Sequence, residues 1–226
     1  MGQLDIDYYC RVYDGLLTQD HCDEYIELYE ETLRVDAEKQ RRLSVCYRAD
    51  VAIDRFVEVV GQYKQDVGVH EHQFPKQFGW EELRIKRFLI EGGDKDNDYM
   101  PNNYHGLENH VDVYSFAHAK RFLCLMVYLN DDFYGGETVF PTFGSKVKPK
   151  KGMVFVFPPT WTYLHHGAPP LGPSKLGAKY FLMTHCNYID KTKINKYDGN
   201  AFERDTAATD PLIDEMTNKE LQWQNT

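Results

Sequence analysis

The chain has little positive charge for its length. It carries 26 Lys and Arg against 35 Asp and Glu, a formal net charge of −9 over 226 residues. Proteins that bind duplex nucleic acid neutralise phosphates with Lys and Arg, so we expect no nucleic-acid partner. No apolar run approaches the roughly 20 residues that cross a bilayer, and the N-terminus lacks the apolar stretch of a secretory signal. We therefore expect no membrane partner and a cytoplasmic location.

The sequence also lacks the cysteine patterns of disulfide frameworks and zinc sites. Its five cysteines are scattered, odd in number and form no CxxC pair; they are Cys10, Cys22, Cys46, Cys124 and Cys186. Such usage is typical of reduced thiols in a cytoplasmic protein.

Aromatic residues, at 14% of the chain, are plentiful, and such residues favour strands and pocket walls. Helical periodicity predicts amphipathic helices over residues 18–34, with Thr18 as N-cap, and over about 50–66. Strand patterns follow at 83–90, 121–130, 137–141, 153–157 and 179–188. Because no helical segment separates these strands, we expect an antiparallel sandwich or jelly roll.

The segments arrange into a single domain with a polar extension. We expect N-terminal helices, about residues 1–80, to pack on a jelly roll of about residues 81–190. Residues 191–226 are polar, and 211–221 have a helical pattern that begins at Pro211. Residues 91–109 are rich in Gly, Asn and Asp, and we expect a long loop. We hypothesise that this loop is a lid over a substrate groove, because long loops in compact domains are often functional.

His110 and Asp112 are the first candidate metal ligands. On an extended strand, side chains two residues apart point to the same side, so an imidazole and a carboxylate would face one metal. A third ligand must come from another strand, and His165 and His166 follow the strand at 153–157. Two histidines and one carboxylate leave coordination positions open, which suits Fe(II) that must also bind a co-substrate and O₂. An HxD tripeptide by itself also fits a surface His beside a solvated Asp.

Three segments together resemble the prolyl 4-hydroxylase family of Fe(II)- and 2-oxoglutarate-dependent dioxygenases. They are HVDVYSFAHAKRFLCLMVYLNDDFYGGETVFP, GMVFVFPPTWTYLHHGAPP and the N-terminal YCRVYDGLLTQDHCDEYIELYE. The resemblance covers roughly residues 8–190. It implies a mainly β fold with flanking helices, a double-stranded β-helix (jelly roll, cupin-like). It also implies Fe(II), 2-oxoglutarate and O₂, with ascorbate as a further requirement.

The resemblance assigns metal ligation to His110, Asp112 and His165. His165 stands four residues before Pro169, which matches the family's spacing, but His166 stands four before Pro170. We favour His165, and His166 stays the alternative.

The family places a basic residue for the far carboxylate of 2-oxoglutarate on the strand after the distal histidine. Lys179 fits this position, although the separation of 179 − 165 = 14 residues is a few longer than usual. Lys175, in the preceding loop, is the rival. The resemblance also places Tyr128 and Thr138 at the co-substrate, and Phe88 where relatives often carry Tyr.

The expected activity is hydroxylation of proline residues in a peptide or protein. Two alternatives stay open. One is a dioxygenase of a free amino acid or another small molecule, and the other is a catalytically silent jelly-roll binding module. Substrate identity, the hydroxylated position and the oligomeric state do not follow from the sequence.

Overall fold

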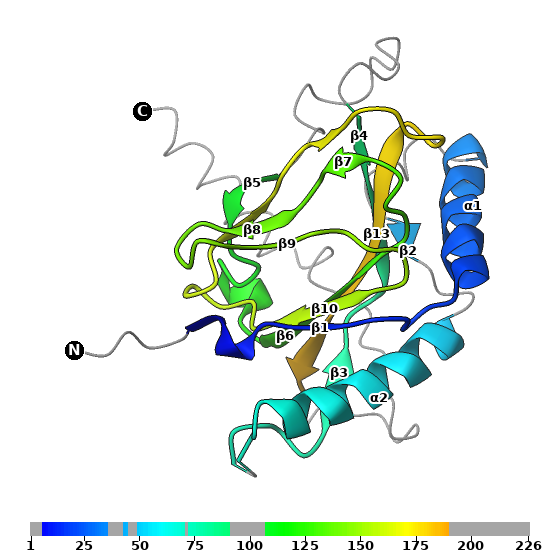
Figure 1. Ribbon diagram of the computed structural model, residues 1–226. Coiled ribbons are helices and arrows are strands. Elements are labelled where there is room, and N and C mark those ends of the chain that lie inside the picture. The colour runs from blue at the N-terminus through cyan, green and yellow to red at the C-terminus, as the bar shows by residue number, and fades with distance from the viewer. Residues whose placement is uncertain (1–5, 36–42, 45–48, 71, 91–106, 190–226) are drawn as a thin grey trace, which may run out of the picture.

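The computed structural model describes residues 6–35, 43–44, 49–70, 72–90 and 107–189. Two antiparallel sheets face each other, and two helices cover the outside of the larger one. Figure 1 shows both helices, α1 (Gln19–Val35) and α2 (Ala49–Asp66), along one margin of the molecule, with the smaller sheet on the other side. The arrangement is a jelly roll, as predicted, and both predicted helices are present.

The larger sheet has seven strands in the order β1–β10–β6–β13–β4–β2, with β3 paired to β13. Their bounds are β1 Arg11–Tyr13, β2 Leu43–Ser44, β3 Phe78–Trp80, β4 Arg84–Leu89, β6 Arg121–Tyr128, β10 Val154–Phe157 and β13 Ala178–Tyr188. Strands β6 and β13 lie in the interior of this sheet, and apolar clusters cover both of its faces, so both faces of these strands are buried. This explains why their sequences are almost continuously apolar.

The smaller sheet has four strands in the order β5–β11–β8–β9. They are β5 Leu107–His110, β8 Thr138–Phe140, β9 Ser145–Val147 and β11 His165–Gly167. A third, two-stranded sheet joins β7 (Tyr134–Gly135) to β12 (Pro170–Leu171). Two short 3₁₀ helices, η1 (Ile6–Tyr9) and η3 (Phe116–His118), complete the described elements.

The larger sheet separates two apolar clusters, because neighbouring residues on a strand point to opposite faces. On β6, Leu123, Leu125 and Val127 face the helices, whereas Cys124 and Met126 face the smaller sheet. The same alternation sends Val154 and Val156 of β10 outward and its two phenylalanines inward, and on β13 it sends Leu182 outward and Phe181 inward. The outer face therefore anchors the helices, and the inner face is left to line a pocket.

The N-cap predicted for α1 is present: the Thr18 hydroxyl accepts a hydrogen bond from the His21 amide, 3.2 Å away. No disulfide joins the cysteines in the described part of the chain. Among the described helices none is both long enough and apolar enough for a membrane span.

One expectation from the sequence needs correction, and others concern residues that the structure does not describe. The long loop predicted for 91–109 is wrong at its end, since Leu107–Asn109 belong to β5. This short, polar strand has no alternating apolar pattern that would have revealed it. Residues 91–106, which hold most of the hypothesised lid, and the extension at 191–226 lie outside the described residues. The domain boundaries stay a prediction.

Gly152 is the point where the chain entering α1 approaches the sheet most closely. Its φ is +78°, and a Cβ added there would overlap the carbonyl oxygen of Leu17. Its amide donates to Tyr128 O (2.8 Å), and its carbonyl accepts from the Leu17 amide (3.3 Å). Only glycine satisfies both the backbone conformation and the contact.

We expect Gly152→Ala to lower the free energy of unfolding by about 3 kcal/mol, combining left-handed strain with a backbone clash. Gly144→Ala is the matched control, because Gly144 also has a positive φ (+66°) but nothing within 4 Å of an added Cβ. It should cost about 1 kcal/mol, the strain by itself. Urea denaturation measures both, and equal losses would contradict the role given to the Leu17 contact.

Candidate functional site

Three side chains converge at one end of the smaller sheet. His110 ends β5, His165 begins β11, and the two residues are direct partners across this antiparallel pair, with ring centroids 4.4 Å apart. Asp112 lies two residues beyond the end of β5, so it joins the group from a bend and not from the strand. One ligand atom from each of the three lies within 4.8 Å of the others. The structure thus brings together the three residues expected to bind metal.

Backbone carbonyls orient both imidazoles. His110 Nδ1 lies 2.8 Å from Glu108 O, and His165 Nδ1 lies 2.9 Å from Tyr163 O. A carbonyl oxygen can only accept, so Nδ1 carries the proton in each ring and Nε2 presents a lone pair. Burial lowers the pKa of His165, which favours the neutral, ligating form. The Nε2 atoms of both rings are therefore turned toward a common centre.

Asp112 is held as a carboxylate. Burial raises the pKa of its carboxyl group, but the hydrogen bond and charge of His185, with the charges of His165 and Lys86, outweigh burial. The resulting pKa is well below its usual range. Oδ2 lies 3.1 Å from His185 Nε2, whereas Oδ1 lies 3.7 Å from His110 Nε2. One oxygen is thus tied to His185 while the other faces His110.

Glu81, His185 and Arg121 form a buried network behind Asp112, and Glu81 and His185 were not predicted from the sequence. Glu81 Oε1 accepts from Arg121 Nε (2.6 Å), and Glu81 Oε2 lies 3.2 Å from His185 Nδ1. Arg121 also donates to the backbone oxygen of Asp112 (2.9 Å). Burial raises the pKa of Glu81, but the hydrogen bonds from His185 and Arg121 bring it well below its usual range. The network fixes both the side chain and the backbone of Asp112.

Asp112, Cys124 and His185 form a second group with ligand-type atoms in mutual reach. Burial raises the pKa of Cys124 well above its usual value, and the Asp112 charge raises it further. A thiol that stays protonated is a poor metal ligand, and His185 already faces two carboxylates. This second group therefore supports Asp112 and does not compete for a metal.

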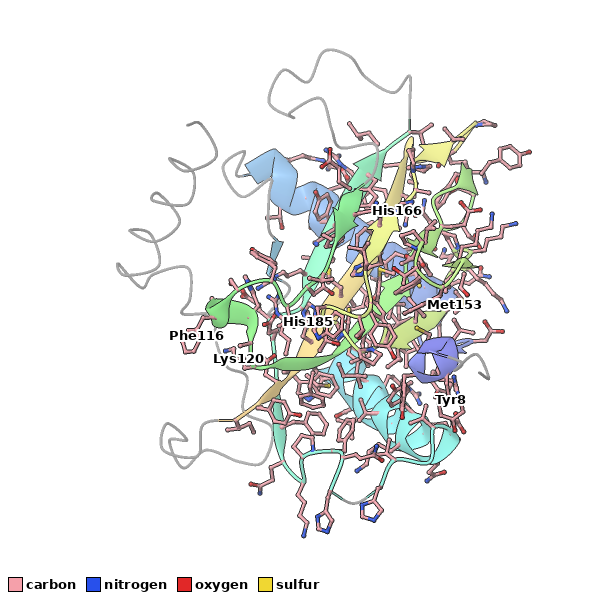
Figure 2. The ribbon with its side chains drawn as sticks, turned by 90° about the vertical axis from the view of Figure 1, so that its left-hand side faces the viewer. Tyr8, Phe116, Lys120, Met153, His166 and His185 are labelled. Carbon is pink, nitrogen blue, oxygen red and sulfur yellow. The ribbon has the colours of Figure 1, made fainter. Side chains whose placement is uncertain are left out.

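His166, the alternative distal ligand, points elsewhere. Adjacent residues of a strand face opposite sides, and His166 Nδ1 lies 2.8 Å from Asn109 Oδ1. Figure 2 labels His166 on its strand, with His185 inside the body of the molecule and Phe116 projecting from it. His166 thus bridges β11 to β5 through a side-chain hydrogen bond, while its neighbour faces Asp112.

A pocket connects the three converging residues to Lys179. It lies between the two sheets and is walled mainly by aromatic and sulfur-containing side chains; the lining includes Phe88, Met126, Phe157, Phe181 and Met183, with His110, Asp112, Thr138, His165 and Lys179 as polar members. A few polar groups in an apolar cleft are typical of a small-molecule site.

Lys179 is almost fully buried, at 1% exposure. Its ammonium donates to Gly136 O (2.6 Å) and lies over the rings of Phe88, Tyr128 and Phe181. Burial lowers the pKa of Lys179 to about 7, although the charge of Glu137 works against this. By contrast Lys175, the rival lysine, is exposed on its loop. A cation buried without a carboxylate contact is suited to an anionic ligand.

Tyr128 and Thr138, the other two residues expected at the co-substrate, are hydrogen-bonded to each other with 2.8 Å between their oxygens. Thr138 lines the pocket, and the Tyr128 ring lies under the Lys179 ammonium at 5.1 Å. Phe88 also lines the pocket. These residues therefore gather at the lysine end, away from the histidines.

The donor set fits a divalent metal ion such as Fe(II). Two imidazole nitrogens and one carboxylate oxygen occupy one side of a centre that opens onto the pocket. This facial arrangement leaves positions for a bidentate ligand and a further small molecule.

Two comparisons of the sequence with known proteins give similar results. Residues 97–184 match the sequence profile of the 2OG-Fe(II) oxygenase superfamily. A protein of Acanthamoeba polyphaga mimivirus named "Putative prolyl 4-hydroxylase" is 34% identical over 70 residues, which are 27% of this chain and 28% of the viral protein. The match therefore spans under a third of that relative's length.

Solved structures show the same fold. The viral collagen prolyl hydroxylase of Paramecium bursaria Chlorella virus-1 superposes with a TM-score of 0.56 at 21% identity, covering 80% of this chain and 97% of that one. A Pseudomonas putida prolyl-4-hydroxylase gives 0.53 at 15% identity, over 80% and 93% of the chains. A Trichoplax adhaerens prolyl hydroxylase with a hypoxia inducible factor peptide gives 0.53 at 13%, over 80% and 84%.

We expect His165→Ala to abolish tight Fe(II) binding, because two remaining ligands hold the metal poorly, and His166→Ala to leave it within about twofold of wild type. The two variants differ by one position in β11 and serve as each other's control. Anaerobic calorimetric titration with Fe(II) measures both. Loss of binding in His166→Ala with retention in His165→Ala would reverse the assignment.

The sequence match, the jelly roll and the convergence of two histidines and an aspartate at its pocket agree with one another. Residues 97–184 of this chain are thus similar to the 2OG-Fe(II) oxygenase superfamily, within a fold that prolyl hydroxylases share.

Proposed function

We propose that this protein is an Fe(II)- and 2-oxoglutarate-dependent hydroxylase that acts on proline residues in a peptide or protein. One observation carries the proposal: a single pocket joins a two-histidine, one-carboxylate group to a buried lysine. A silent binding module would have no need for three converging ligands and a desolvated cation. In this proposal His110, Asp112 and His165 hold the iron, and Lys179 binds the co-substrate.

The pocket positions 2-oxoglutarate by its two ends. The far carboxylate would pair with the Lys179 ammonium, and the Thr138 hydroxyl, held by Tyr128, supplies a second hydrogen bond there. Charge-assisted hydrogen bonds in an apolar pocket are strong and geometrically selective. Phe88 has no hydroxyl, so this wall contributes packing and no hydrogen bond. The keto end is thereby directed to the histidines and Asp112.

When bound, Fe(II) supplies the activation of O₂ that couples decarboxylation of 2-oxoglutarate to hydroxylation of a C–H bond. The chain's own contribution is orientation and exclusion of water. Phe157, Phe181 and Met183 line the pocket with apolar surface, which shields reactive species from solvent. The Glu81–His185 pair keeps Asp112 ionised and aimed.

A prolyl substrate is supported by the names of similar proteins. The mimivirus relative and the Chlorella virus, Pseudomonas and Trichoplax proteins are all named as prolyl hydroxylases, and the last was solved with a peptide. We propose a proline-containing peptide or protein as partner and ascorbate as an activator that keeps the iron reduced.

The activity is tested by succinate formation from 2-oxoglutarate with Fe(II), ascorbate and air, with and without a proline-rich peptide. We expect peptide-stimulated succinate in wild type and a loss of more than about 100-fold in His110→Ala, because a ligand is removed. His166→Ala is the matched control and should stay active. Turnover without peptide stimulation would move the substrate to a small molecule, and failure to bind Fe(II) would favour a binding module.

Binding of 2-oxoglutarate should weaken as the pH rises. The ammonium form of Lys179 binds the carboxylate, and its pKa in the empty pocket is about 7. Affinity is therefore full below pH 7 and falls above it, by up to about tenfold per pH unit until the raised pKa of the bound lysine is reached. Lys179→Met should weaken binding about 10- to 100-fold at pH 6 and remove this slope.

Lys175→Met is the control for this experiment, because it removes an exposed lysine from the neighbouring loop. Calorimetric titration of 2-oxoglutarate into the metal-loaded protein between pH 6 and 9 measures all three proteins. A slope that survives in Lys179→Met and disappears in Lys175→Met would assign the co-substrate to the loop lysine instead.

A further inference from the structure

A second lysine, Lys86, lines the same pocket. It lies on β4 opposite Phe181 of β13. Strand alternation places Lys86 and Phe88 on the inner face of the larger sheet, while Ile85, the residue before Lys86, packs in the cluster under the helices. Lys86 acts electrostatically on Asp112 and His165, which places its ammonium at the metal end of the pocket. Lys179 and Lys86 therefore line one cavity, and Lys86 is the lysine that interacts with Asp112.

Nearby carboxylates already have other partners. Asp112 Oδ2 faces His185, and its Oδ1 faces His110 Nε2. Glu81 is bonded to Arg121 and His185. The backbone of Lys86 pairs with β13, and among the described residues its ammonium makes no hydrogen bond or ion pair, although it interacts with the charge of Asp112.

Asp112 is the negative charge that acts on Lys86, and its carboxylate is shared with His185 and His110. Burial lowers the pKa of Lys86, although the Asp112 charge raises it again. A metal dication bound by Asp112 would draw on the same carboxylate. An anionic ligand would then offset the positive charge of Lys86.

The co-substrate accounts for one carboxylate at Lys179 and another at the metal. We propose that Lys86 binds a carboxylate of the primary substrate, so that the hydroxylated carbon lies close to an acidic group. This inference rests on the proposed function and narrows its substrate. The shared chemistry is a carboxylate beside the oxidised ring: an Asp or Glu next to proline in a peptide, or the α-carboxylate of free proline.

The test uses matched substrates that differ by one charge. Blocked peptides carrying Pro-Asp or Pro-Asn form one pair, and free proline and prolinamide form the other. For wild type we expect kcat/KM to favour the acid over its amide by at least about tenfold, the size of one charge-assisted hydrogen bond. Lys86→Met, which keeps the length of the side chain, should bring the ratio near one, while Lys175→Met keeps the wild-type ratio.

The pair that shows the preference identifies the source of the carboxylate. Preference for Pro-Asp assigns a peptide, and preference for proline over prolinamide assigns a small molecule. Equal kcat/KM for acid and amide in both pairs of wild type would overturn the proposal. A Lys86→Met variant that keeps the preference for the acid would also overturn the proposal. If this variant raises the KM for 2-oxoglutarate about tenfold, Lys86 binds the co-substrate instead.

Binding gives a readout that does not depend on turnover. The same four compounds are titrated calorimetrically, without O₂, into protein loaded with Fe(II) and 2-oxoglutarate. Acid-selective binding that is lost in Lys86→Met supports the role of Lys86 even if no succinate forms. In that case only the proposed hydroxylase activity is wrong. If succinate forms but neither binding nor kcat/KM favours the acids, the proposed hydroxylase activity stands and the inference about Lys86 is wrong.

Discussion

The pairing of β5 with β11 is the constraint on which the site depends. His110 and His165 are opposite each other in this antiparallel register, and backbone carbonyls turn both rings so that Nε2 faces inward. A shift of one residue would place His166 opposite His110 and turn His165 to the other face. The same strand pair is also held by the side-chain contact of His166 with Asn109. Neither histidine of the HH pair is therefore interchangeable with the other.

Much of the fold followed from pattern. The helical periodicities gave α1 and α2, and the apolar runs gave β6, β10 and β13, because their burial on both faces leaves a strong signal. The choice between His165 and His166 was different. Both stand four residues before a proline, so spacing favoured neither, and only strand register separates them. The polar strand β5 was taken for the end of a loop for the same reason: its pairing is dictated by partners distant in sequence.

Glu81 and His185, which support Asp112, were missed, although inward-facing polar positions on neighbouring strands gave part of the signal. In the segment LRIKRF, the alternation of Leu83 and Ile85 toward the helices implies that Arg84 and Lys86 face inward. Similarly, His185 follows Phe181 and Met183 at intervals of two on β13. Charged residues at inward positions of an otherwise apolar strand are expensive unless paired, so such positions indicate function. What no pattern could give is which carboxylate each would meet.

The three candidate metal ligands differ in how far along the chain the contacts that orient them lie. Each imidazole is turned by a carbonyl two residues away, so its aim is set as soon as the local segment adopts its conformation. Asp112 instead relies on His185, 73 residues later, and His185 on Glu81, 104 residues earlier. Contacts of such sequence separation form late, since loop closure must come first. The orientation of the Asp112 carboxylate therefore depends on the place of β13 in the larger sheet, whereas each imidazole is oriented within its own segment.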